Sequence, residues 1–366
     1  MSIRFRIGRI WWRTGPSSGY DHRRFFVRKK ADPPVTQEHP FAPYVRILGK
    51  GPHLSRPLTF DEARDAAAMI MAGKVEPVQL GAFLCLLRVR TETPEEVGGL
   101  ARAFKDSLVK PVGVSVDVDW AAWAGKTRQL PYFLLAALTL AGHGISVLMH
   151  GAEHHSAGRL YASDALAALG VPACTSVEDA ARRLEATKFA LLPLSALSQP
   201  LHAIMGLKPI LGLRSPLHTI GRLLNPFDAP FSINAVTHPP YLAIHQKAAR
   251  LLGQINMAAF KGEGGEAERR PEKSCDVHFL ADGQTGSEEW PALIDAVRPK
   301  EETLDPARLK ALWTGELVDE IAAATIAGTI AVVLRYSGRA GSVDEAEGMG
   351  LAMWRDRIKT SVPGRS

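Results

Sequence analysis

Strand-like segments alternate with apolar helix-like segments from residue 112 onward, and this alternation limits the possible folds more than any other feature. We expect strands at residues 112–118 (VGVSVDV), 145–151 (ISVLMHG) and 189–194 (FALLPL), and helices at residues 131–144 and 162–171. Strands that alternate with helices in this way are typical of a parallel sheet covered by helices. The sequence therefore predicts an α/β domain over residues 113–366 with a mostly parallel sheet.

A helical segment precedes this domain. Apolar residues recur at helical spacing between residues 58 and 109. Three helix starts are marked by two capping boxes and a proline: Thr59 with Glu62, Glu76 with Pro77, and Thr93 with Glu96. We therefore expect a small all-helical domain over residues 54–112, joined by later helices near residues 196–224.

The composition points to a globular protein in a reducing compartment. The chain has 366 residues, of which 46% are hydrophobic, and no stretch predicts a membrane span. The start of the chain lacks the apolar core of a secretory signal. The three cysteines, Cys85, Cys174 and Cys275, stand far apart, which argues against a disulfide framework. We therefore expect a cytoplasmic protein without membrane partners.

The first 53 residues form a basic arm that we expect to be disordered. Residues 1–50 hold eleven Lys and Arg against three acids, whereas the rest of the chain carries a small net negative charge. The aromatic residues Trp11, Trp12, Phe25 and Phe26 lie among these cations, a mixture that suits contacts with phosphates and stacked bases. Two other interpretations stay open: a simple tail, or upstream sequence included by a misassigned start codon.

Three histidines lie close together in the stretch "ISVLMHGAEHHSAG", namely His150, His154 and His155. They could hold zinc only if the loop brought all three together, and no fourth ligand at a known spacing supports this. We therefore expect no metal site here. The stretch fits better as a phosphate-binding loop whose phosphate-binding residues have been replaced. His150 and Gly151 would then remain as structural residues at the carboxyl end of a strand.

Several stretches resemble the superfamily of anthranilate phosphoribosyltransferase and pyrimidine nucleoside phosphorylase, the family-three glycosyl transferases. The matching stretches begin "LTFDEARDAAAMIMAGK", "HGAEHHSAGRLYASDALAALGV", "LGLRSPLHTIGRLLNPF" and "GRAGSVDEAEGMGLA". Together they extend over residues 57–355. The resemblance implies an α/β domain with a small helical domain that carries a homodimer interface. It also implies a transferase that uses phosphoribosyl pyrophosphate and Mg²⁺.

The phosphate-binding loops depart from the family pattern. The family has a Gly-Thr-Gly-Gly-Asp loop after its first strand, where this chain has "DWAAWAGKTRQ" with the single Gly125. The residues Lys126, Thr127 and Arg128 either offer charge to a phosphate or form the polar start of the next helix. In the second loop, Ala152-Glu153 stands where the family has Asn-Arg, so an anion replaces a cation. Ser156 either binds a phosphate or caps the next helix.

The metal site of the family is also altered. Residues 261–289 are polar and rich in Gly and Glu, so we expect an exposed loop or an irregular hairpin there. The family's adjacent acidic pair would fall on Glu263 and Glu266, separated by two glycines. A magnesium ion needs a fixed cage of oxygen ligands. We expect an ordinary acidic loop and no metal.

A branch of the superfamily, the YbiB-like proteins, lacks the same loops and is described as nucleic-acid-binding homodimers. The chain resembles this branch most closely, and a local excess of cations agrees with it. Residues 200–261 hold one acid, Asp228, and six cations that we expect to contact DNA or RNA phosphates: Lys208, Arg214, Arg222, Lys247, Arg250 and Lys261. Alternatively, these cations form a solvated face, with Arg214 and Arg222 in internal salt bridges.

Two functions therefore remain. The leading hypothesis is a homodimer, paired through its helical domain, that binds nucleic-acid phosphates without sequence preference and uses no cofactor. We assign it no catalytic residue. The alternative is a glycosyl or phosphoribosyl transferase that binds a phosphorylated sugar, with Mg²⁺ and phosphoribosyl pyrophosphate as cofactor and donor. Its ligand cleft would comprise Lys126, Thr127, Arg128, His150, Gly151, Ser156 and Arg214. Arg214 is included because the resemblance matches it to a family arginine that contacts the aromatic acceptor.

Overall fold

The computed structural model describes residues 37–297 and 303–365. The chain divides into two compact units, Met1–Pro40 and Phe41–Ser366, and every described helix and strand lies in the second. Most of the predicted arm therefore lies outside the described residues. Its last part forms helix α1 (Ala42–Gly49), because the fully buried Phe41 packs edge-on against Phe83 and ties this segment to the core.

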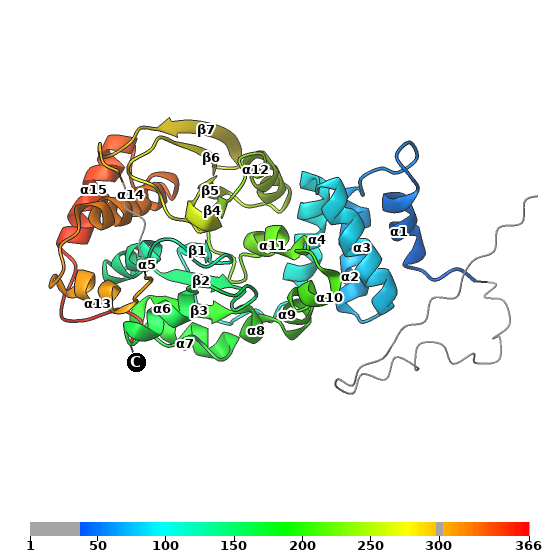
Figure 1. Ribbon diagram of the computed structural model, residues 1–366, viewed down its shortest axis with the longest axis horizontal. Helices are drawn as coiled ribbons and strands as arrows, with labels where there is room; N and C mark the ends of the chain where they lie inside the picture. The colour runs from blue at the N-terminus through cyan, green and yellow to red at the C-terminus, as the bar shows by residue number, and fades with distance from the viewer. Residues whose placement is uncertain (1–36, 298–302, 366) are drawn as a thin grey trace, which may run out of the picture. The chain divides into compact units, whose positions relative to one another are not determined.

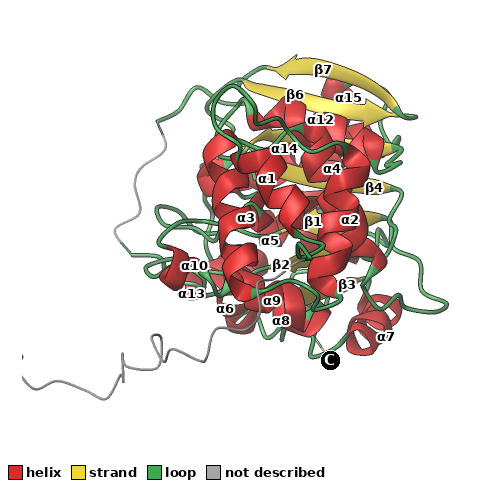
Figure 2. Ribbon diagram, turned by 90° about the vertical axis from the view of Figure 1, so that its right-hand side faces the viewer, coloured by secondary structure: helices red, strands yellow, loops and turns green. Residues whose placement is uncertain are grey.

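Four N-terminal helices pack together as a bundle, with α2 against α4 and α1 against α3 (Figures 1 and 2). The bundle helices after α1 are α2 (Phe60–Met71), α3 (Pro77–Arg90) and α4 (Pro94–Asp106). Both predicted capping boxes are confirmed, because the Thr59 and Thr93 hydroxyls accept the N–H groups of Glu62 and Glu96 while those glutamates cap in return.

Short helices from later in the chain join this bundle, near the residues where we expected them. They are α8 (Leu194–Leu197), α9 (Gln199–Met205), α10 (Lys208–Leu211), α11 (Leu217–Ile220) and the 3₁₀ turn η2 (Gly221–Leu223). Helix α11 packs against α4 and α9. A segment that follows the third strand therefore returns to the helical bundle and connects it to the sheet.

The sheet has seven strands in the order β3-β2-β1-β4-β5-β6-β7. The strands are β1 (Val118–Ala121), β2 (Val147–Gly151), β3 (Phe189–Pro193), β4 (Phe231–Val236), β5 (Asn256–Lys261), β6 (Cys275–Ala281) and β7 (Gln284–Trp290). The first five pair in parallel, and β6 and β7 add an antiparallel hairpin at one edge. The predicted fold class, a helical domain with an α/β domain whose sheet is mostly parallel, is confirmed.

Side chains on the two faces of the sheet belong to two hydrophobic cores. One core takes in Trp120 of β1 and buried residues of α5 (Tyr132–Gly142), α6 (Ala162–Ala168), α13 (Ala307–Thr314), α14 (Glu320–Tyr336) and α15 (Val343–Arg355). The other takes in Ala121 of β1 and buried residues of α7 (Val177–Thr187), α12 (Tyr241–Leu251) and the bundle. Helices therefore cover both faces, and Figure 2 shows the bundle helices in front of the strands.

Two local predictions are wrong in detail. The first strand occupies Val118–Ala121 and not residues 112–118, and all four of its residues are buried. A central parallel strand is covered on both faces, so its sequence need not alternate between apolar and polar residues. Residues 261–289 do include a hairpin, β6 with β7, but residues 265–269 are buried and do not form an exposed loop. No helix among the described residues is both long and apolar enough to span a bilayer.

Candidate functional site

The carboxyl ends of β1, β2, β4 and β5 meet beside the helices α10 and α11, and the loops that leave these strands form the candidate site (Figure 1). In parallel sheets this edge is where ligands bind. The loop after β1 spans residues 122–131, and the loop after β2 spans residues 152–161. The loop after β5 contains the short turn η3 (Glu263–Gly265).

The loop after β1 contains a pair of backbone N–H groups that bind an internal carboxylate. Ala124 N and Gly125 N donate hydrogen bonds of 2.7 and 2.5 Å to Oε1 of Glu266. Glu266 is almost fully buried, and burial raises its pKa against the opposing effects of Arg222 and these two amides. Adjacent N–H groups in a loop of this kind bind anions. Here the chain supplies the anion itself.

Lys126 is buried in an ion pair. Its Nζ lies 2.8 Å from Oε1 of Glu268, and both side chains are shielded from solvent. Oε2 of Glu268 accepts the N–H of Phe133, at the start of α5. Lys126 therefore neutralises an internal acid and does not face a ligand, whereas Thr127 and Arg128 are exposed.

The acidic loop does not fit a magnesium ion. Glu266 and Glu268 are buried and bonded to the loop after β1, and Glu263 lies 3.6 Å from Arg270. The only carboxylate oxygen of Glu266 left unpaired is Oε2. Magnesium requires near-octahedral oxygen coordination. The described part of the chain contains no cluster of three His, Cys, Asp or Glu side chains suited to a metal.

The three histidines, one near the end of β2 and two in the loop after it, lie in different surroundings. His150 is fully buried, 3.1 Å from Asp119 and edge-on to Trp123. His154 is exposed, whereas Nε2 of His155 lies 3.0 Å from the carbonyl oxygen of Trp123. Gly151 is required for packing, because a Cβ there would collide with the backbone of the loop after β1.

A cavity of about 140 Å³ opens at the carboxyl end of β4, and its charged lining groups are cations. Arg88 comes from α3, Arg214 from the segment between α10 and α11, and Arg222 from η2. No Asp or Glu of the described chain lines this cavity. Arg222 is buried and donates to the carbonyl of Gly265 at 2.8 Å. Arg214 has no hydrogen-bond or ion-pair partner among the described residues.

More cations lie close to this cavity and act on it electrostatically. Burial lowers the pKa of Arg214, and the neighbouring Arg159 and Arg88 lower it further. Lys208 donates to the Ser156 hydroxyl at 2.9 Å, so Ser156 binds a lysine and does not cap the next helix. Because only cations supply charge to the lining of this cavity, the cleft favours an anionic ligand.

Two histidines in this cleft are neutral at pH 7. Burial lowers the pKa of His155 to about 4, and the charge of Arg214 contributes. Burial lowers the pKa of His218 to about 2, and His155 and Arg214 contribute. The two imidazole rings lie 4.6 Å apart. A neutral imidazole offers one donor and one acceptor, so these rings can orient a ligand without adding charge.

The structure distributes the six predicted nucleic-acid cations over several places. Arg214 and Arg222 line one cavity and Lys208 contacts the neighbouring loop. Lys247 and Arg250 are exposed on α12, and Lys261 is exposed at the end of β5. Arg222 is buried against Gly265, so it is not available to a polymer.

Sequence reasoning missed Arg88, which lines the cleft, and Arg159, whose charge acts on Arg214. Arg88 and Tyr241 are far apart in sequence, yet Arg88 donates to the Tyr241 hydroxyl at 3.2 Å. No local pattern predicts such a contact. Two signals had pointed to Arg214: the excess of cations between residues 200 and 261, and the resemblance to the family's acceptor-binding arginine.

Known proteins share this architecture. Residues 42–108 match the helical bundle domain of the glycosyl transferase family. The chain is 27% identical over 220 residues to anthranilate phosphoribosyltransferase of Desulfitobacterium hafniense (strain DSM 10664 / DCB-2). This alignment covers 60% of this chain and 64% of that enzyme, so the chain matches less than two thirds of the enzyme's length. It is 24% identical over 243 residues to the uncharacterized protein YbiB of Escherichia coli (strain K12). This alignment covers 64% of this chain and 75% of YbiB.

Solved structures agree with these relatives. Anthranilate phosphoribosyltransferase from Thermus thermophilus superimposes with a TM-score of 0.73 at 22% identity, covering 87% of this chain and 94% of that one. The enzyme from Saccharomyces cerevisiae, in complex with PRPP and Mg, gives a TM-score of 0.66 at 17% identity, with 89% and 100% covered. The resemblance inferred from sequence is confirmed: the chain carries the family's helical bundle and the fold of anthranilate phosphoribosyltransferase.

Proposed function

We propose that the chain is a glycosyl transferase of the phosphoribosyltransferase type that binds a phosphorylated sugar in the cationic cleft. The observation that carries this proposal is the cavity at the end of β4, lined by Arg88, Arg214 and Arg222 and by no acid of the described chain. A sugar phosphate would place its phosphate beside Arg214, whose guanidinium lacks a partner there. Arginine suits this role because its planar fork binds phosphate oxygens in pairs.

The site differs from one built for pyrophosphate and magnesium. The carboxylate of Glu266 accepts hydrogen bonds from the backbone amides of Ala124 and Gly125. A second anion at those amides would be repelled by the charge of this carboxylate. Glu268 is neutralised by Lys126. We therefore infer a donor whose phosphate contacts arginine side chains, and not a pyrophosphate held in the loop after β1. Thr127 and Arg128 are exposed and remain candidates for ligand contacts.

The test is calorimetric titration of the full chain with ribose 5-phosphate. Arg214→Ala should weaken binding about tenfold or more, because hydrogen bonds to charged groups contribute about 1.5 to 3 kcal/mol. The matched control is the Lys247→Glu/Arg250→Glu double variant, which changes exposed cations on α12 and should leave this affinity unchanged. Equal affinity in wild type and Arg214→Ala would remove the proposal.

A second function, nucleic-acid binding, is supported by a different set of residues. Lys247, Arg250 and Lys261 are exposed and have no acidic partner among the described residues. The one acid of this region, Asp228, is already paired with Lys105 at 2.6 Å. The same two variants separate the functions. The double variant should bind fluorescent single-stranded DNA more weakly than the wild type, whereas Arg214→Ala should bind it equally well. The affinity of the wild type for this DNA should fall as the salt concentration rises.

We also propose that the chain forms a homodimer through its helical bundle. Large apolar side chains are exposed on this part of the surface, including Val78 and Val89 of α3 and Ile210 of α10, each about four fifths exposed. A second copy of the chain would cover such a surface, because apolar groups gain stability when they leave water. Sedimentation equilibrium of the full chain, at several concentrations, tests this.

A further inference from the structure

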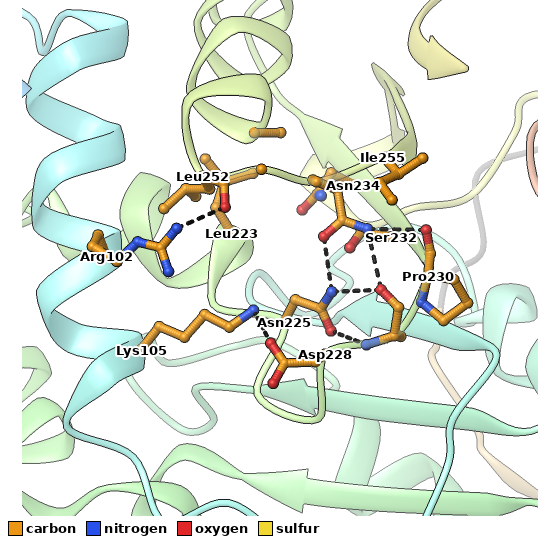
Figure 3. A pocket seen from close by; sticks show the side chains of 14 residues that line it. Arg102, Lys105, Leu223, Asn225, Asp228, Pro230, Ser232, Asn234, Leu252 and Ile255 are labelled. Atoms are coloured by element: carbon orange, nitrogen blue, oxygen red, sulfur yellow. Dashed lines mark hydrogen bonds and ion pairs between the residues drawn. The ribbon is translucent and has the colours of Figure 1, made fainter. Parts of the chain in front are cut away.

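A second cavity, of about 210 Å³, lies apart from the cationic cleft (Figure 3). Its lining comes from α4, from the residues before and within β4, and from the turn that joins α12 to β5. It begins at Pro230, before β4, whereas the cleft lies at Val236 and Thr237, where β4 ends. The two cavities therefore share no lining residue, although both contact β4.

The inner wall of this cavity contains an amide group without a partner. Asn234 is fully buried, and neither its Nδ2 nor its Oδ1 makes a hydrogen bond within the described chain. Its neighbour along the same face of β4, Ser232, is also buried and lines the cavity. An unsatisfied buried amide costs about 1 to 3 kcal/mol, so a ligand that supplies its partners would recover this loss.

The other amides in the cavity are already satisfied. Asn225 donates to Gln254 at 2.8 Å and also binds both the N–H and the carbonyl of Ala229. Gln254 in turn donates to the carbonyls of Pro230 and Asn256. Figure 3 shows these bonds as a network beside Asn234. The unused donor and acceptor therefore belong to Asn234 and not to its surroundings.

Charged groups stand at the α4 side of the cavity. Arg102 uses one nitrogen on the carbonyl of Leu252, at 2.9 Å, and lies 3.8 Å from Asp106. Lys105 and Lys110 bind the two carboxylate oxygens of Asp228, at 2.6 and 2.7 Å. Aliphatic side chains such as Leu223 and Ile255 also line the cavity. One side of the cavity thus suits a charged group, and the other suits a neutral group with a donor and an acceptor.

We propose that this cavity binds a small carboxylate that also carries a primary amide, of the kind represented by glutamine and asparagine. The ligand's amide pairs with Asn234, because two primary amides can each donate to and accept from the other. The ligand's carboxylate faces Arg102. Glutamate lacks the amide donor and would place a second negative charge beside Asn234, which costs desolvation without a counter-charge.

The experiment is calorimetric titration of the full chain with glutamine, asparagine and glutamate. Glutamine or asparagine should bind, and glutamate should bind at least about tenfold more weakly. Asn234→Leu, which keeps the volume and removes both polar atoms, should abolish binding. Arg102→Gln changes only a partly exposed side chain and should weaken binding about tenfold. This variant still tests the proposal if Asn234→Leu fails to fold.

Three results would overturn the proposal: no heat from either amide ligand up to about 10 mM, equal affinity for glutamate, or binding unchanged in both variants. Arg214→Ala serves as the matched control, because it changes the cationic cleft and should leave glutamine binding intact. The outcome is thereby independent of the proposed sugar-phosphate function.

Discussion

At the scale of single residues, the cleft is defined by which groups are charged and which are held neutral. Arg214 keeps an unpartnered guanidinium, whereas burial and the neighbouring cations lower the pKa of His155 and His218. His245, fully buried on α12, is also held neutral, and burial lowers its pKa to about 3. These histidines therefore shape the cleft at neutral pH and oppose folding in acid.

The stability of the protein should fall as the pH is lowered from 6.5. An unfolded histidine titrates near 6.5, so between that value and the folded pKa the unfolded state binds a proton that the folded state does not. Each of the two histidines with the most strongly lowered pKa, His218 and His245, should cost about 1.4 kcal/mol per pH unit in this range. The full stability is present above pH 6.5.

Urea denaturation at several pH values checks this expectation. His245→Gln removes one of the two groups, so its stability should fall less steeply between pH 6.5 and 5 than that of the wild type. Parallel curves for the two proteins would mean that His245 is protonated in the folded state.

At the scale of elements, the loops after β1 and β5 are joined by two buried acids. Glu266 binds the amides of Ala124 and Gly125, and Glu268 binds Lys126. Gly262 permits this approach, because a Cβ there would collide with the backbone carbonyl of Glu266. The loop after β5 thus occupies the anion-binding amides of the loop after β1. This contact distinguishes the site from a loop whose amides are open to a ligand.

Lys126→Met should destabilise the chain by about 3 to 5 kcal/mol, because it leaves the Glu268 carboxylate buried without a counter-charge. The control is Arg56→Met, which removes an ion pair with Glu62 of similar length, 2.6 Å, at the surface. That change should cost less than about 1 kcal/mol. Chemical denaturation measures both, and a loss at Lys126 as small as at Arg56 would refute the buried pair.

Some elements could be read from the sequence, and others could not. The helix starts at Thr59 and Thr93 were predictable, because a capping box is a local hydrogen-bond pattern. Strands β4 and β5 were not predicted. Each is a short run with few polar residues, and periodicity alone does not separate such a run from a helix segment. The role of Glu266 depends on contacts between distant loops, so no local pattern indicated it.

At the scale of the whole molecule, the chain combines the fold of anthranilate phosphoribosyltransferase with a cationic cleft at the carboxyl end of β4. The helical bundle supplies Arg88, the segment between α10 and α11 supplies Arg214, and the sheet positions both at the carboxyl end of β4. The fold was predictable because it follows from the alternation of strands and helices. The cleft was predictable only in part, through Arg214, because its other groups converge from separate elements.

The measurement that tests this account most directly is a calorimetric comparison of ribose 5-phosphate with phosphoribosyl pyrophosphate, each with and without Mg²⁺. With Glu266 on the loop amides and Glu268 paired to Lys126, the two ligands should bind within about threefold of each other, and Mg²⁺ should not increase either affinity. A pyrophosphate ligand that binds a hundredfold more tightly, about 2.7 kcal/mol, and only with Mg²⁺, would contradict the account. It would mean that the acidic loop releases the amides and receives the metal.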